Sequence, residues 1–359
     1  MTAFDPRGPG GSHHLARLIS VAVVTLALCG SSEAARRAKP APSRPASLTA
    51  ESIQNAQFPG DKNARPGREL IAKTQILLAQ AHFSPGEVDA RDGENFRKAL
   101  KAFAEARNLQ ASGKLSREIF DALNSNASYS ATITYQLVDE DLKGPFVNDL
   151  PTKMEDMKDL PGLPYRNITE ALAEKFHMSE ELLKALNPQS SFSQPGETIL
   201  VANTPVGDPG VKAARVEIDK KAQTVRAFDG NNSLIAFYPA TIGSREKPSP
   251  SGELKVTTVQ KNPNYRYNPD YAFKGVSAKK PFTIKPGPNN PVGTMWIGLS
   301  EKGYGIHGTA EPAKVSKAES HGCVRLTNWD AEELSQMVSR GTPVVFIDGD
   351  QHRPRTASR

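Results

Sequence analysis

One cysteine and two histidines lie close together near the end of the 359-residue chain. His321 precedes Cys323 by two residues, and His307 lies sixteen residues before Cys323. A cysteine reacts as the thiolate, which is a minor species near neutral pH unless a base takes the proton. An imidazole within reach can act as that base. The spacing therefore predicts Cys323 as a nucleophile and His307 as its proton acceptor and donor.

Two glycines and an arginine accompany these residues. Gly308 leaves its backbone carbonyl open to approach by the His307 imidazole N–H. Gly322 permits a tight turn, which would aim the amides of Gly322 and Cys323 at one point and form an oxyanion hole. Arg325 adds a fixed positive charge that suits a substrate carboxylate.

Two other interpretations of the same residues exist. A free cysteine is often a buried, inert side chain, but the neighbouring histidines, glycines and arginine count against that. A metal site made of Cys323, His307 and His321 lacks an apparent fourth ligand. We therefore predict no metal.

The elements that must position these residues read as strands. Apolar residues alternate with polar ones from Ala214 onward, and residues 229–232 (DGNN) are typical of a hairpin turn. Short strands with Gly, Pro and Asn breaks continue to residue 347. One helix is expected from Asn328 to Val338, with Asn328 as its N-cap. Residues 214–348 are thus predicted to form a mostly β catalytic domain.

This region resembles the L,D-transpeptidase family with a YkuD-type catalytic domain. The resemblance spans residues 214–348, and one departure is SPSG at 249–252, where the family often has TPxG. The motifs that carry it are HGT at 307–309 and SHGCVRL at 320–326, supported by YPATIG at 238–243, GPNNPVG at 287–293, WI at 296–297, YGI at 304–306 and NWDA at 328–331.

The resemblance implies a reaction on peptidoglycan stem peptides. Cys323 would attack the carbonyl of the third stem residue and expel the terminal D-Ala, and His307, oriented by the Gly308 carbonyl, would move the protons. A second stem amine would resolve the thioester to a 3→3 cross-link, no organic cofactor would be required, and carbapenems would be inhibitors. The remaining residues that it implies in substrate binding or the oxyanion hole are Ser320, His321, Gly322, Arg325 and Tyr304.

Residues 66–125 are predicted to be a small three-helix unit, because apolar residues recur at helical spacing. A break at GKLS (113–116) leaves Ser116 to cap the last helix. The unit resembles the peptidoglycan-binding domain family, on QILL (75–78), FSPGEVD (83–89), ALKAF (99–103) and GKL (113–115). A generic helical spacer is the alternative.

Residues 126–163 are irregular and read as a connector of unassigned role. Residues 164–203 resemble a LysM-like βααβ module, a small binder of glycan strands, although no strand is evident before Tyr165. A plain helical connector is the alternative. The fold class expected for the whole chain is multidomain α+β.

The chain begins with features of a secretory signal peptide over residues 1–34: a charged lead, an apolar stretch at 18–28 and a small-residue end at Ala34. A retained membrane anchor is one alternative, and a lipoprotein attached through Cys29 is another, against which Leu28 counts. Cleavage after Ala34 would leave Cys323 as the one cysteine. The expected location is therefore the periplasm or cell envelope.

The remaining segments are low in information. Residues 35–65 read as a Pro/Ala-rich linker, and residues 349–359 read as a disordered basic tail. The net charge of +6 is spread along the chain with no basic run beyond Arg36 and Arg37, so it does not indicate nucleic acid as a partner. The composition, 38% hydrophobic and 23% charged, is ordinary for a globular protein.

Other activities stay open at this stage. Water as acceptor would make the chain an L,D-carboxypeptidase, and the lysine of a wall-anchored lipoprotein would make it a protein-to-peptidoglycan ligase. A non-catalytic wall-binding scaffold is the alternative of another class, against which the intact His307, Cys323 and Arg325 count.

Overall fold

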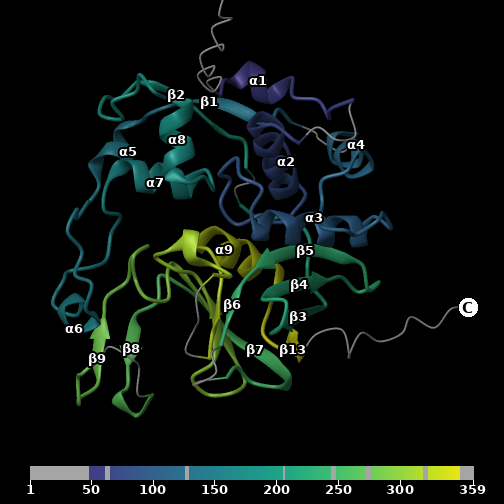
Figure 1. Ribbon diagram of the computed structural model, residues 1–359. Helices are drawn as coiled ribbons and strands as arrows, with labels where there is room; N and C mark the ends of the chain where they lie inside the picture. The colour runs from purple at the N-terminus through teal and green to yellow at the C-terminus, as the bar shows by residue number, and fades with distance from the viewer. Residues whose placement is uncertain are drawn as a thin grey trace, which may run out of the picture. The chain divides into compact units, whose positions relative to one another are not determined.

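Figure 1 shows the computed structural model, which describes residues 48–60, 65–125, 129–204, 207–243, 248–271, 276–317 and 322–347. The predicted signal peptide with Cys29, the predicted tail at 349–359, and Ser320 and His321 lie outside the described residues. Ser47–Arg359 forms one compact unit. Among the described helices, none has both the length and the hydropathy that a bilayer span requires.

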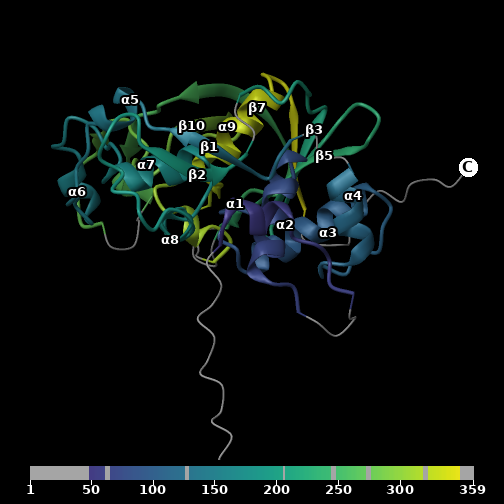
Figure 2. The ribbon, with the colours of Figure 1, turned by 90° about the horizontal axis from the view of Figure 1, so that it is seen from above.

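The N-terminal part of the described chain is helical. It contains α1 (Ala50–Gln54), α2 (Arg68–Gln80), α3 (Glu94–Ala106) and α4 (Arg117–Ser125). Helices α2, α3 and α4 lie side by side (Figures 1 and 2), and their buried apolar residues form one core. The rings of Phe83 and Phe103 meet edge to face in that core, 5.4 Å apart. Ser116 caps α4 as predicted, since its Oγ accepts from Ile119 N.

The end of the predicted linker is structured. Thr49 and Ser52 form a capping box at the start of α1. Leu48 and Ile53 are buried in an apolar core that also includes residues of α2 and of the part of the chain from 131 to 202, which we call the middle module. A helix cap, two buried apolar side chains and a hydrogen bond from Lys73 Nζ to the Gln54 carbonyl hold this segment, which composition alone assigned to the linker.

The middle module combines two strands and two helices. Strand β1 (Thr132–Gln136) pairs antiparallel with β2 (Thr198–Ala202), and α7 (Ile168–Lys175) and α8 (Glu180–Leu186) lie between them in sequence. Helices α5 (Asp139–Lys143) and α6 (Met154–Met157) occupy the predicted connector. The first strand thus precedes Tyr165 by a long insertion, and most of its side chains are exposed.

The C-terminal domain is built on a nine-stranded sheet in the order β5-β4-β3-β13-β7-β10-β11-β12-β6. Its strands are β3 (Arg215–Asp219), β4 (Thr224–Phe228), β5 (Leu234–Pro239), β6 (Thr241–Ile242), β7 (Gly252–Lys261), β10 (Met295–Leu299), β11 (Gly305–His307), β12 (Val324–Arg325) and β13 (Pro343–Ile347). Strands β8 (Tyr265–Tyr267) and β9 (Phe282–Ile284) form a separate hairpin, and short 3₁₀ helices occur at Pro269–Tyr271 and Pro312–Lys314.

The helical unit covers one edge of this sheet. Strand β5 is the edge strand, and Phe237 exchanges backbone hydrogen bonds with the segment after α2: its N donates to His82 O, and its O accepts from Ser84 N, both at 2.9 Å. Arg226 on β4 pairs with Glu105 on α3 at 2.9 Å. The backbone groups of Phe237 at this edge are thereby paired within the chain, and paired edge groups are not available to another molecule.

One predicted cap is wrong. Helix α9 spans Asn328–Met337, and its N-cap is Thr327, whose Oγ1 accepts from Asp330 N at 3.1 Å. Asn328 is the first helical residue, so its carboxamide is not used for capping. The predicted hairpin at 229–232 is present between β4 and β5, closed by Asp229 Oδ1 accepting from the amides of Asn231 and Ser233.

Candidate active site

The parallel pairing of β11 with β12 brings the two halves of the predicted site together. His307 lies opposite Arg325, and Ile306 lies opposite Val324. Ile306 and Val324 are buried in the sheet core, so the alternation of side chains puts His307 and Arg325 on the other face. Cys323 lies at the start of β12 and interacts electrostatically with Arg325. The short parallel pairing of β11 and β12 therefore places His307 on the same face of the sheet as Arg325, although the two lie far apart in sequence.

The His307 ring is held on two sides. Its Nδ1 lies 2.7 Å from the carbonyl oxygen of Gly308. The indole of Trp296 on β10 stacks on it with centroids 5.7 Å apart and an interplanar angle of 15°. Gly305 makes room for that indole, because a Cβ there would come within 2.5 Å of it. With Nδ1–H donating to the carbonyl, Nε2 carries the lone pair, which is the tautomer that a base requires.

Burial also sets the charge of this imidazole. His307 is only 4% exposed. Desolvation lowers its pKa to about 3, and the nearby Arg325 charge adds to the shift. The ring is consequently neutral around pH 7 and available to accept a proton.

The turn before Cys323 depends on Gly322. Gly322 has a φ of +98°, a region that favours glycine. The buried hydroxyl of Ser249 donates to the Gly322 carbonyl at 2.7 Å. Cys323 is half-buried, with its Sγ 3.7 Å from the Gly303 carbonyl oxygen. Ser249 entered the sequence analysis only as part of a family motif, and its contact with Gly322 had no signal in the spacing.

Arg325 is a half-buried cation near the thiol. Desolvation lowers the pKa of its guanidinium, and interactions with Glu311, Cys323 and Tyr265 oppose that shift. Its Nε is inaccessible to solvent and has no hydrogen-bond partner among the described residues.

Two predictions from the sequence are left to compare with the structure: the role of Tyr304 and the absence of a metal site. Tyr304 lies just before β11, where its backbone carbonyl accepts from Leu299 N at 3.0 Å. Within the described ranges, no group of three or more His, Cys, Asp and Glu side chains is arranged to hold a metal ion. His321, the third member of the metal site considered from the sequence, is outside those ranges, and so is Ser320.

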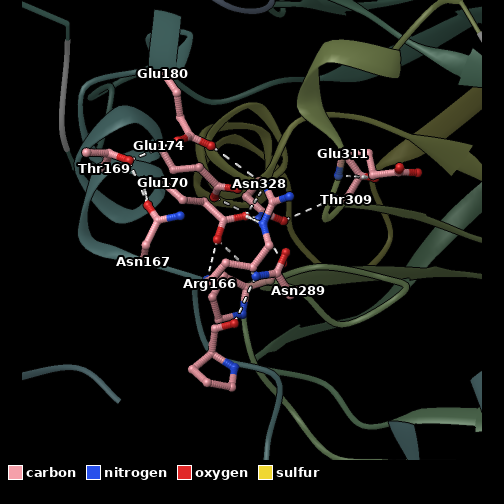
Figure 3. Close-up of polar contacts among 12 residues, drawn as sticks. Arg166, Asn167, Thr169, Glu170, Glu174, Glu180, Asn289, Thr309, Glu311 and Asn328 are labelled. Atoms are coloured by element: carbon pink, nitrogen blue, oxygen red, sulfur yellow. Dashed lines mark hydrogen bonds and ion pairs between the residues drawn. The ribbon is translucent and has the colours of Figure 1, made fainter. Parts of the chain in front are cut away.

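A second polar cluster, drawn in Figure 3, includes Thr309, which lies two residues after His307. Its centre is Asn328, which is 3% exposed. The carboxamide contacts Thr309 and Thr294 of the catalytic domain and Glu174 of the middle module. Sequence reasoning missed this cluster because it gave Asn328 the role of a helix cap.

Two segments of the chain match known families. Residues 213–346 match the L,D-transpeptidase catalytic domain, and residues 67–123 match a putative peptidoglycan binding domain. Neither segment includes the middle module, so its LysM assignment stays a prediction.

Similar proteins share the catalytic region. A putative L,D-transpeptidase of Bacillus subtilis, YqjB, is 32% identical over 152 residues, covering 41% of this chain and 79% of the relative. The putative L,D-transpeptidase YkuD of Bacillus licheniformis is 28% identical over 177 residues, covering 49% of this chain and 90% of the relative. The solved catalytic domain of the E. faecium L,D-transpeptidase is 22% identical with a TM-score of 0.30, covering 38% of this chain and 99% of that one.

Proposed function

This chain belongs to the L,D-transpeptidase family, and we propose that it forms 3→3 cross-links in peptidoglycan through a Cys323 thioester. The observation that carries the proposal is the parallel β11–β12 pair, which has a neutral, buried His307 and the Arg325 guanidinium on the face beside Cys323. The peptidoglycan-binding domain match at residues 67–123 supports the same polymer as substrate.

The acylation half of the reaction follows from the state of His307. Nε2 takes the proton of the Cys323 thiol as Sγ attacks the carbonyl carbon of the third stem residue. The amides of Gly322 and Cys323 are the proposed donors to the oxyanion. When the C–N bond to the terminal D-Ala breaks, His307 returns the proton to the leaving amine. The products are free D-Ala and a thioester on Cys323.

The second half reverses the proton path. The side-chain amine of another stem peptide attacks the thioester and gives a proton to His307. The C–S bond then breaks and His307 reprotonates the thiolate, so the enzyme is regenerated without a cofactor. Arg325 would hold a carboxylate of one stem peptide during these steps.

Because the pKa of His307 is lowered to about 3, the resting site is expected to hold a neutral imidazole. This differs from a preformed thiolate–imidazolium pair, in which the histidine is charged before substrate binds. His307 then acts as a general base during attack, and its protonated form exists only while the oxyanion is present.

The wall-binding and export predictions fit this proposal. A binding domain tethered to the catalytic domain raises the local concentration of an insoluble polymer at the active site. The substrate lies outside the cytoplasm, so we also propose that the chain is exported. N-terminal sequencing of the protein recovered from cells tests this, and a first residue other than Ala35 would contradict the proposed cleavage point.

The decisive experiment uses a disaccharide-tetrapeptide substrate with wild-type protein and Cys323→Ala in parallel. We expect dimers that lack one D-Ala, seen by mass spectrometry, with wild type alone. Free tripeptide without dimers would identify a carboxypeptidase, and coupling to an added lysine peptide would identify a ligase. No D-Ala release from wild type would leave the non-catalytic scaffold as the remaining interpretation.

The site assignment has its own test. Carbapenems acylate a nucleophilic thiol, and we expect a single adduct that maps to Cys323. An adduct on any other residue would overturn the assignment of the nucleophile.

A further inference from the structure

The turn that follows His307 is built around the side chain of Asn328. Asn328 Oδ1 accepts from Thr309 N at 3.0 Å and from Thr294 N at 3.1 Å. Gly308 packs directly on the same oxygen, since a Cβ at that position would come within 2.2 Å of it. The Gly308 carbonyl accepts the His307 Nδ1–H, and the amide of the next residue, Thr309, is the one held by Asn328.

The other end of the Asn328 carboxamide faces Glu174. Asn328 Nδ2 donates to Glu174 Oε2 at 2.9 Å and, at 3.2 Å, to the Pro288 carbonyl. Glu174 lies on α7, 154 residues earlier in the chain, and is 8% exposed. A carboxamide has one accepting and one donating end, so an acceptor at Nδ2 selects the rotamer that turns Oδ1 toward the two backbone amides.

Contacts with the turn at residues 287–290 hold the start of α7, the helix that carries Glu174, in place. Asn289 Nδ2 donates to the Pro164 carbonyl at 2.8 Å and to Glu170 Oε2 at 3.3 Å. Asn289 N donates to the Leu163 carbonyl at 3.0 Å. Gly287 lies so close to that carbonyl that a Cβ would approach the oxygen within 2.0 Å. The start of α7 is thus fixed to the 287–290 turn of the catalytic domain.

The charge state of Glu174 bears on how it acts. Burial raises the pKa of Glu174 to about 8, and the Asn328 hydrogen bond opposes the shift. Glu170, Glu332 and Glu87 raise it further by their negative charges. Near pH 7 the carboxyl is mostly protonated, and its second oxygen still accepts from Nδ2. A neutral amide acceptor should therefore replace it.

We propose that Glu174 is a positioning residue for His307. Its hydrogen bond fixes the Asn328 carboxamide, which fixes the Gly308–Thr309 turn and so the carbonyl that orients the imidazole. The inference rests on the proposed function, because it assigns Glu174 to the same proton transfer. It also means that a residue of the middle module, Glu174, helps to hold the active-site turn of the catalytic domain through its hydrogen bond with Asn328.

The test compares three variants of the full-length protein. Glu174→Gln keeps the acceptor, Glu174→Met removes it at similar volume, and Glu181→Met makes the same change at an exposed site on α8. The readout is the rate of carbapenem acylation at Cys323 together with kcat and KM for D-Ala release. Loss of a group that orients a reacting side chain is expected to lower the rate about 10-fold to 100-fold.

We expect Glu174→Met to lower kcat and the acylation rate at least about tenfold with little change in KM, while the other two stay within about threefold of wild type. The ¹⁵N shifts of the His307 ring provide a signature that a merely structural role would not move. Wild type and Glu174→Gln should show the Nδ1–H tautomer, and Glu174→Met should show a mixture.

Opposite results overturn the proposal. A folded Glu174→Met with the wild-type rate, or equal losses in Glu174→Met and Glu174→Gln, would do so. If Glu174→Met does not fold, Glu174→Ala repeats the comparison without any added side-chain bulk. Absence of any adduct in wild type would instead count against the proposed function, so the two failures are distinguishable.

Discussion

Two histidines of this molecule lie in closely similar surroundings. His307 stacks on Trp296 with centroids 5.7 Å apart, and His177, at the end of α7, stacks on Trp329 of α9 with centroids 5.2 Å apart. Burial lowers the pKa of each to about 3.

Their neighbours differ. His307 donates to Gly308 O and lies opposite Arg325, beside the Cys323 thiol. His177 instead uses its backbone carbonyl to accept from Val88 N at 2.8 Å. Stacking and burial thus set the protonation state of a histidine, and the groups within reach of its free nitrogen decide whether that state performs chemistry.

The largest expected difference comes from making the same substitution at both positions. His307→Asn should lower kcat/KM for D-Ala release by about 100-fold or more, because the base is lost. His177→Asn should stay within about threefold, since Asn tolerates the φ of +56° at that residue. Steady-state kinetics on both proteins measure the difference. Comparable losses would contradict the view that the groups near the free nitrogen of His307, and not its stacking and burial, decide its function.

Gly308→Ala tests the turn that orients His307. The new Cβ would meet Asn328 Oδ1 and the Asn328 backbone, so the turn must move. We expect a loss of about tenfold or more in kcat and about 1–3 kcal/mol in the free energy of unfolding. Urea denaturation and kinetics measure both. Gly230→Ala is the control, because that position has open space around it. If the Gly308→Ala protein is as active as this control, the turn at Gly308 does not orient His307.

Ser249→Ala tests the turn before Cys323. The change leaves the buried Gly322 carbonyl without its hydroxyl donor, which should cost about 1–3 kcal/mol of stability. Acylation of Cys323 should slow by up to about tenfold as the turn loosens. Ser251→Ala removes an exposed hydroxyl that accepts from Lys220 Nζ and should change neither quantity. Identical melting and acylation curves for the two variants would contradict the assigned contact.

The effect expected to be smallest near pH 7 is the pH dependence of stability, which grows only on acidification. A histidine with a pKa of about 3 when folded and about 6.5 when unfolded binds its proton only in the unfolded state between those values. Stability is therefore lost as the pH falls from about 6.5 toward 3. Replacing His177 by Asn should make that slope shallower by up to about 1.4 kcal/mol per pH unit. Urea denaturation at several pH values measures the slope of stability against pH. The same slope in wild type and His177→Asn would mean that folding does not lower the pKa of His177.

Much of the catalytic face could be read from local spacing. His307 and Gly308 are adjacent, and a glycine before Cys323 signals the turn that the φ of Gly322 displays. The hairpin at Asp229 and the cap at Ser116 were predicted for the same reason, since each depends on residues within four positions.

Predictions failed where a distant partner decides the conformation. Asn328 looked like a helix cap, but Thr327 caps α9 and leaves the Asn328 carboxamide to Thr309 and Glu174. The connector also gained contacts that its composition did not indicate: Glu155 on α6 accepts from the amides of Ser277 and Ala278 at 2.6 and 3.2 Å.

The sequence by itself determined which groups are available for chemistry: a thiol, an imidazole and a guanidinium, with glycines where the backbone must turn. Short-range geometry does not depend on the rest of the fold, so such motifs can be recognised in one dimension. The tertiary structure alone decided that His307 faces Arg325, that Ser249 reaches Gly322, and that Glu174 stands behind the active site. Those contacts join segments whose separation along the chain carries no directional information, so only the packing of sheet and helices could select them.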